Sequence, residues 1–195
     1  VHEPFSFNLK KVFSKKQFIM NWHYFAEGIR DYGARRYWPM LLFFLAINMS
    51  SMGGIFTLSN FVLAIVTFYV GKKITSKNKH KFLKIGAFTH SITMILRTLL
   101  KSISFIAIVQ GFGALTFSIL NVPFHSIFYN NSKKKGITHM VYVREIYLNL
   151  GRAFSVLIGM FLLLYLDPVI MLVIIVMVGG LSALFMTSIK DEIEG

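Results

Sequence analysis

Two groups of polar and ionisable side chains lie inside stretches that are otherwise apolar. They are His23, Glu27, Arg30, Asp31 and Arg35 in the first group and Glu145, Asn149 and Arg152 in the second. Residues three or four apart are neighbours on a helix surface, so each group forms a polar stripe along one side of a helix. Carboxylates in such stripes can bind a proton or a cation, or orient a solute.

The stretches that carry these residues have the composition of a membrane protein. The chain has 195 residues, of which 55% are hydrophobic and only 15% are charged. A soluble domain usually has about 25% charged residues. The segment 168–189 has no ionisable side chain, and about 20 apolar residues are enough to cross a bilayer. We therefore expect an all-α membrane protein.

The pattern of apolar stretches and loops predicts one bundle of six transmembrane helices. The expected spans are 18–47, 53–71, 82–100, 103–129, 138–166 and 168–189. Residues 1–17 are a basic linker and 190–195 a tail. Asp167 and Pro168 predict a clean helix start, as an N-cap followed by proline in the first turn. The chain begins at Val1 without a signal-peptide pattern, so we expect 1–17 to be a linker or the edge of a longer protein.

Loop charges predict the orientation. The net charge is +13, and most basic residues lie before the first span or in alternate loops. They are Lys10, Lys11, Lys15, Lys16, Lys72, Lys73, Lys77, Lys79, Lys81, Lys84, Lys133, Lys134, Lys135, Arg144 and Lys190, against Arg97 and Lys101 on the other side. Basic loops stay in the cytoplasm, so both termini are expected there, and the charge indicates topology rather than nucleic-acid binding.

The first span has an alternative interpretation. Residues 17–35 could form an amphipathic helix in the membrane interface, with Trp38 to Val70 as one long span. The bundle would then have five spans and an external N-terminus.

The charges inside the spans also have two interpretations. A charge near the centre of a spanning helix costs about 2.5–3.5 kcal/mol on insertion scales, so it needs a partner or a wet cavity. Either they line a solute or proton pathway, or they form ion pairs such as Glu27 with Arg30 and Asp31 with Arg35 that only join helices. We favour the structural role for Arg144 and Glu145. The full candidate pathway set is Glu27, Arg30, Asp31, Asn60, Gln110, Asn121, His125, Glu145, Asn149 and Arg152.

Of these, Asn60, Gln110 and Asn121 are expected to form hydrogen bonds between helices, and His125, like His90 outside the set, is expected to be structural. Pro123 and the region 28–39 can interrupt helices, as in transporters whose broken helices bind substrate.

Signals of catalysis and of cofactors are missing from the sequence. There is no cysteine, no HExxH, no GxSxG and no GxxxxGK[ST]. His23 and Glu27 could share a metal, but further ligands are lacking. We expect no enzyme activity, no cofactor and no metal.

The loop between the second and third spans resembles a motif of the major facilitator superfamily. That motif reads G-x-x-x-D-x-x-G-R-[RK]; here Gly71 matches the opening glycine, and Lys79 and Lys81 match the basic tail. Thr75 and Asn78 stand where the family has aspartate and glycine. The segments 26–41 and 144–152 also look like stretches of bacterial members, and the span layout is similar to the C-terminal six-helix half of such a transporter.

The resemblance implies a secondary active transporter with alternating access, in which Glu27 and Asp31 are the candidates for proton coupling. Its expected partners are a lipid bilayer, a small solute or ion, and an N-terminal six-helix half or a second copy. A bacterial cell membrane is the expected location. Two alternatives stay open: a membrane scaffold that transports nothing, and a membrane-embedded enzyme that modifies lipids.

Overall fold

The computed structural model describes residues 15–45, 47–99 and 102–191, and every regular element in that part of the chain is helical. The elements are α2 (Lys15–Tyr32), the π-helical turn η1 (Gly33–Tyr37), α3 (Trp38–Phe44), α4 (Met49–Lys73), α5 (Lys79–Arg97), α6 (Ile103–Lys135), α7 (Ile137–Leu163), α8 (Pro168–Phe185) and the 3-10 turn η2 (Met186–Ser188). The expectation of an all-α protein is confirmed.

Four of these helices are long and apolar enough to cross a membrane, which gives the chain the character of a multi-pass membrane protein. They cover Met49–Lys73, Ile103–Lys134, Ile137–Leu163 and Pro168–Ser188. The α2 and α5 helices occupy the other two predicted spans but fall outside this group. The charged residues of α2 and the lysines that begin α5 lower their apolar character. A six-span count therefore stays a prediction.

The first predicted span is one helical rod with an irregular turn. The α2, η1 and α3 elements follow one another without a gap, and the rod ends at Phe44. The α4 helix then begins at Met49, where the Asn48 side chain accepts a hydrogen bond from the Ser50 N–H at 2.7 Å. A single helix from Trp38 to Val70 is therefore wrong. The expected interruption between residues 28 and 39 is confirmed, as the π-helical turn η1.

The N-cap predicted at the last span is also confirmed. The Asp167 carboxylate accepts a hydrogen bond from the Val169 N–H at 2.8 Å, and Pro168 is the first residue of α8. This cap satisfies one of the amide groups that a helix start leaves without a partner.

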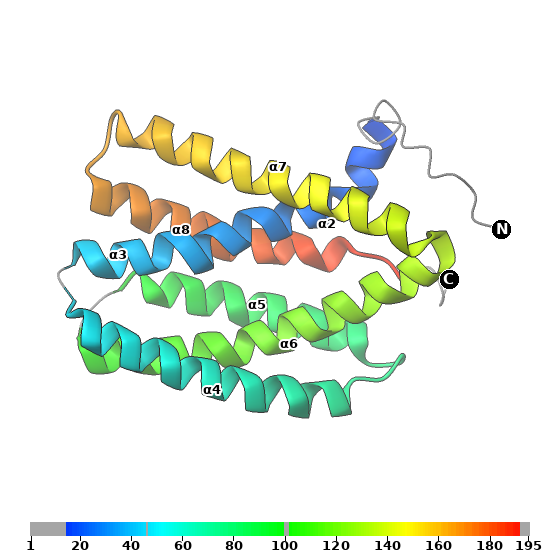
Figure 1. The fold of residues 1–195 in the computed structure, drawn as a ribbon, viewed down its shortest axis with the longest axis horizontal. Helices are drawn as coiled ribbons and strands as arrows, with labels where there is room; N and C mark the ends of the chain where they lie inside the picture. Colours follow the sequence, from blue (N-terminus) through cyan, green and yellow to red (C-terminus); the bar gives the residue numbers. More distant parts are fainter. Residues whose placement is uncertain (1–14, 46, 100–101, 192–195) are drawn as a thin grey trace.

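The helices run back and forth along one direction (Figure 1). The α2 helix packs on α7 and α8, α5 packs on α6 and α8, and α4 packs on α6. The α4–α5 turn, the α6–α7 junction and the end of α8 lie at the same end of the bundle. The lysines of those segments therefore gather at that end: Lys72, Lys73, Lys77, Lys79, Lys81, Lys84, Lys133, Lys134 and Lys190.

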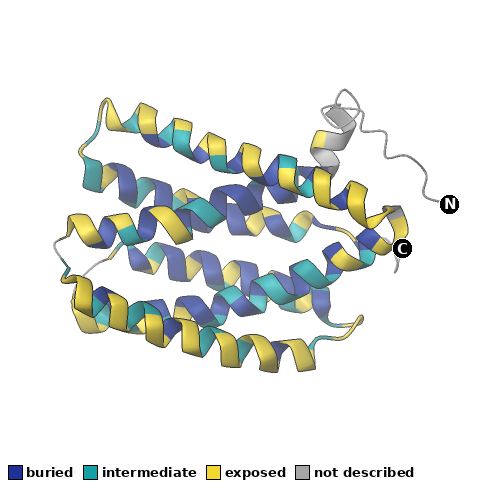
Figure 2. Ribbon diagram, viewed as in Figure 1, coloured by how far each residue is buried: buried dark blue, intermediate teal, exposed yellow. Residues whose placement is uncertain are grey.

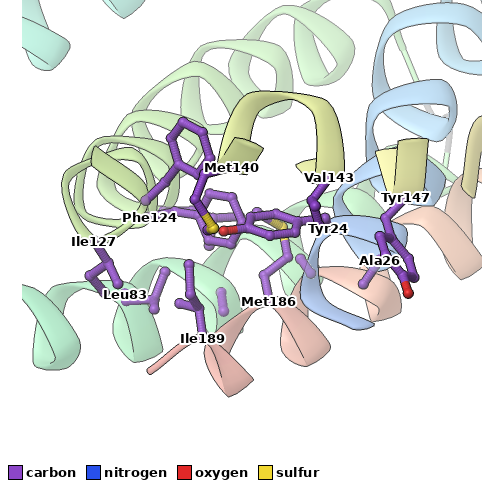
Figure 3. Close-up of a cluster of buried hydrophobic side chains, with 14 residues drawn as sticks. Tyr24, Ala26, Leu83, Phe124, Ile127, Met140, Val143, Tyr147, Met186 and Ile189 are labelled. Atoms are coloured by element: carbon purple, nitrogen blue, oxygen red, sulfur yellow. The ribbon is translucent and has the colours of Figure 1, made fainter. Parts of the chain in front are cut away.

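Apolar side chains form the core and also much of the outer surface. Near the basic end, Tyr24, Leu83, Phe124 and Met186 pack together from four different helices, each at most 1% exposed (Figure 3). The outer edges of α4 and α7 are exposed along their length (Figure 2), with large apolar residues such as Phe61 on α4. An apolar exterior fits lipid as the surrounding solvent.

The basic end is closed by a buried ion pair. The Lys79 ammonium group contacts the Asp191 carboxylate, and both side chains are almost fully buried. Asn130 donates a hydrogen bond to the same carboxylate at 3.3 Å, and Asn131 donates to the Lys190 carbonyl at 2.8 Å. The start of α5 and the end of α6 are thereby joined to the end of the described chain.

The residues that match the loop motif therefore differ in burial and in their contacts. Lys79 is a buried structural residue, while Lys81 is exposed. At Gly71, which matches the opening glycine of the motif, an added Cβ atom would meet no neighbour within 4 Å in the described part of the chain, so no helix packs closely there.

Candidate functional site

Two glycines bring α2 and α7 into backbone contact and so position the charged residues of both helices. A Cβ atom built on Gly28 would overlap the carbonyl oxygen of Leu148, and one built on Gly151 would overlap that of Phe25. Only glycine fits such an approach, which membrane helices often use. The stripe of α2 therefore faces the stripe of α7 across a very short gap.

The Glu27 carboxylate is held by two hydrogen bonds from α7. Arg144 Nη2 donates to Oε1 at 2.6 Å, and Arg144 Nε donates to Oε2 at 3.2 Å. Glu27 is only 3% exposed. Arg144 also contacts Glu145 Oε1 at 3.1 Å and lies 3.4 Å from His125 Nε2 on α6. The two-point geometry is the strong form of a guanidinium–carboxylate contact.

Asp31 forms the second ion pair between the same helices. Arg152 donates to Asp31 Oδ2 through Nη2 at 2.9 Å and through Nε at 3.2 Å. Arg35, one turn further along, contacts Oδ1 of the same carboxylate at 2.9 Å. The predicted pairing of Asp31 with Arg35 is confirmed. The predicted pairing of Glu27 with Arg30 is wrong, because the close approach of α7 places Arg144 on Glu27 instead.

Arg30 is buried, and no carboxylate in the described part of the chain makes a salt bridge with it. It is 2% exposed, and its Nη2 donates to Asn121 Oδ1 on α6 at 3.4 Å. Its Nε and Nη1 have no hydrogen-bond partner. The guanidinium lies 4.9 Å from the centre of the Phe117 ring, a favourable cation–π distance. Asn121 therefore joins helices, as expected.

The remaining α7 and α6 candidates lie at the edge of this cluster. Glu145 and Asn149 are exposed, and Asn149 donates to the Glu145 carbonyl at 2.8 Å and accepts from Arg152 at 3.2 Å. His125 Nδ1 lies 3.0 Å from the Asn121 carbonyl oxygen.

A cavity of about 620 Å³ lies beside the cluster, between η1, α3, α4, α5 and α6. Its polar lining comes from Arg35, Ser59, Asn60, His90, Arg97 and Gln110, and its apolar lining includes Phe56 and Phe117. Pockets for small molecules usually have about 300–1,000 Å³ and this mixture of apolar walls and few polar groups. The cavity can hold a small organic solute.

Gln110 is the central hydrogen-bonding residue of the cavity wall. It accepts from Trp38 Nε1 at 3.0 Å and donates to the Ser59 hydroxyl at 3.1 Å, which joins α3, α6 and α4. The expected helix-to-helix role of Gln110 is confirmed. Asn60 is exposed on α4 and lines the cavity, so its expected role as a helix-to-helix bonder is wrong in the described part of the chain.

Two cavity residues were not predicted as site residues. From the sequence, Arg97 counts only as a charge on the outer side of the membrane and His90 is expected to be structural, yet both are buried in α5 and line the cavity. Their spacing of seven residues, with Thr93 between them, was the available signal, because it places them on one helix face.

The described residues contain no group of three or more histidine, aspartate or glutamate side chains that could hold a metal ion. His23 and Glu27 lie on the same helix, but Glu27 is engaged by Arg144.

The comparisons with known proteins give one relative. The chain is 26% identical over 163 residues to a protein of Bacillus subtilis (strain 168) named YqgE, which is described as uncharacterized. The match covers 77% of this chain but only 37% of that protein's length. No family model matches the chain, and no solved structure is similar to it.

Proposed function

We propose that the chain is half of a secondary active transporter of the major facilitator type, which moves a small solute across the membrane by alternating access. The observation that carries the proposal is the cavity of about 620 Å³, which lies between apolar helices and whose polar lining includes the buried residues Ser59, His90, Arg97 and Gln110. Buried ionisable groups inside membrane proteins commonly mark substrate or ion pathways.

Two features favour a transporter over a purely structural bundle. A scaffold should pair every charge that it buries, because an unpaired charge in an apolar interior is costly. Arg30 and Arg97 are buried, and neither makes a salt bridge with a carboxylate in the described part of the chain. A bundle with a purely structural role would also be expected to pack its helices without a cavity of this size.

The ion pairs suit a proton-coupled mechanism. Glu27 and Asp31 are both held by arginines of the neighbouring helix α7. Protonation of either carboxylate would remove its charge and release the arginine, which would loosen the α2–α7 contact. A proton could in this way bias the bundle between two arrangements.

A partner half is part of the proposal. The polar residues at the surface of η1, α4 and α7 include Arg35, Asn60, Glu145 and Asn149, and an aqueous path between two halves would cover them. The greater length of the Bacillus relative leaves room for such a half. We place both termini in the cytoplasm of a bacterial cell, because the lysines gather at one end of the bundle.

The test is transport by the full-length protein in liposomes that contain a pH-sensitive dye. A panel of sugars, amino acids, organic acids and phosphate esters is added outside, and solute-dependent proton movement is recorded. A transporter gives a signal for at least one solute, whereas a scaffold gives none for any solute.

A Glu27→Gln variant then tests the coupling residue. Loss of proton movement with retained exchange of unlabelled for labelled solute supports Glu27 as the coupling group. Unchanged proton-driven uptake excludes it.

A further inference from the structure

We propose that the cavity beside α5 binds the anionic group of its solute, a carboxylate or a phosphate, and that Arg97 is the residue that holds it. This inference rests on the proposed function in one respect: the bound anion is a transported solute only if the protein is a transporter. Binding of the anion itself depends only on the cavity.

Arg97 is a buried charge that has unused donors and no salt-bridge partner among the described residues. It is 5% exposed, its Nε makes no hydrogen bond, and its Nη1 donates only to the sulfur of Met94 at 3.2 Å. Its guanidinium lies 5.2 Å from the Trp38 ring. Contacts with sulfur and an aromatic ring do not offset most of the desolvation cost of a guanidinium group. Carboxylates and phosphates do so better, because a guanidinium binds them through two parallel hydrogen bonds.

Among the residues that the structure describes, the cavity lining around Arg97 includes no carboxylate. The ionisable residues of the cavity lining are Arg35, His90 and Arg97, and Arg35 is already engaged by Asp31. His90 is 1% exposed; its Nδ1 lies 3.2 Å from the Thr116 hydroxyl, and its Nε2 has no partner. A second unused polar atom thus lies in the same wall. The charge of the wall is positive, so it attracts an anion and repels a cation.

The chain makes room for this guanidinium. A Cβ atom built on Gly113 of α6 would overlap Arg97 Nη2. Nearby Gly111 has open space around it, so the small residue is needed at position 113 and not at 111. The apolar walls at Phe56 and Phe117 complete a site for an anion with an apolar body.

The experiment is calorimetric titration of the full-length protein in nanodiscs with matched probes. Phenylacetate and phenyl phosphate carry the proposed charge, and phenylacetamide is their neutral counterpart. Water-soluble dihexanoyl phosphatidic acid tests whether the anion is a lipid headgroup instead of a free solute. We expect the charged probes to bind and the amide to bind at least about tenfold more weakly, as loss of a charged hydrogen-bonding pair implies.

Two variants assign the binding to Arg97. Arg97→Gln should weaken binding of the charged probes by about 10–100-fold, whereas Lys133→Gln, which removes an exposed charge at the end of α6, should not. Gly113→Ala keeps Arg97 but displaces its guanidinium, so it should weaken binding too, while Gly111→Ala should not. This second pair decides the question where Arg97→Gln fails to fold. Equal binding of phenylacetamide, or unchanged binding in both the Arg97→Gln and Gly113→Ala proteins, would overturn the proposal.

The outcome separates this inference from the proposed function. Arg97-dependent binding without any transport supports the anion site and contradicts the transporter; preference for the lipid probe identifies a headgroup as the ligand. Transport of neutral solutes that Arg97→Gln leaves unchanged supports the transporter and contradicts the anion site.

Discussion

Gly28 of α2 and Gly151 of α7 face each other where the two helices cross. A Cβ atom built on Gly151 would lie 3.2 Å from the Gly28 Cα, and each position would also overlap a backbone carbonyl of the opposite helix. This crossing brings Glu27 to Arg144 and Asp31 to Arg152. The geometry of the charged cluster therefore depends on two residues without side chains.

Replacing either glycine by alanine should force α2 and α7 apart. Since backbone atoms cannot yield as a flexible side chain can, we expect Gly28→Ala and Gly151→Ala each to lower stability by about 3 kcal/mol, the upper end of overpacking costs. Thermal unfolding in detergent measures the change. Gly111→Ala is the control; its Cβ meets open space, and it should be neutral or slightly stabilising. Equal melting temperatures for all three variants would contradict the close approach.

The Glu27–Arg144 pair should show strong energetic coupling. Arg144→Gln alone leaves the buried Glu27 carboxylate without its partner, at a cost of about 3–5 kcal/mol, whereas Glu27→Gln leaves a half-buried Arg144 that still contacts Glu145 and should cost less. The double variant removes both charges, so it should lose less than the sum of the single losses by about 1–3 kcal/mol. A double-mutant cycle from unfolding measurements tests this. Simple additivity would mean that the two side chains do not interact.

The buried Lys79–Asp191 contact should matter more than any neighbouring lysine. Lys79→Ala leaves the Asp191 carboxylate buried without its ammonium partner, so we expect a loss of about 3–5 kcal/mol. Lys81→Ala removes an exposed charge two residues away and should change stability by less than about 0.5 kcal/mol. Similar effects of both substitutions in the same unfolding assay would place Lys79 at the surface.

Single cysteines can test the orientation, because the chain has none of its own. We expect Ser76→Cys, in the α4–α5 turn, to react with a membrane-impermeant maleimide only after the cells are opened. Tyr165→Cys, in the α7–α8 turn at the other end, should react in intact cells. The reverse pattern would invert the proposed topology.

Much of the fold follows from local sequence properties. Three features can be predicted from the local sequence alone. They are the apolar stretches long enough to cross a bilayer, the loops rich in lysine and the helix start at Asp167–Pro168. The end of α3 at Phe44 was harder to predict from the sequence, because apolar residues both precede and follow it.

The site residues were only partly predictable. Local spacing found the stripe of Glu27, Arg30 and Asp31 and the pair of Asp31 with Arg35, because neighbours on one helix are fixed by its period. It assigned the wrong partner to Glu27, and Arg97 served only as an indicator of orientation and not as a site residue.

The sequence by itself determined that this chain is helical, apolar on its outside and positively charged in alternate loops, because these properties depend on residue type and short-range period. Only the tertiary structure decided that Glu27 meets Arg144 and that Arg97 lies unpaired against a cavity. Those contacts join residues far apart in the chain, and they depend on how closely the backbones of separate helices approach at a few glycines.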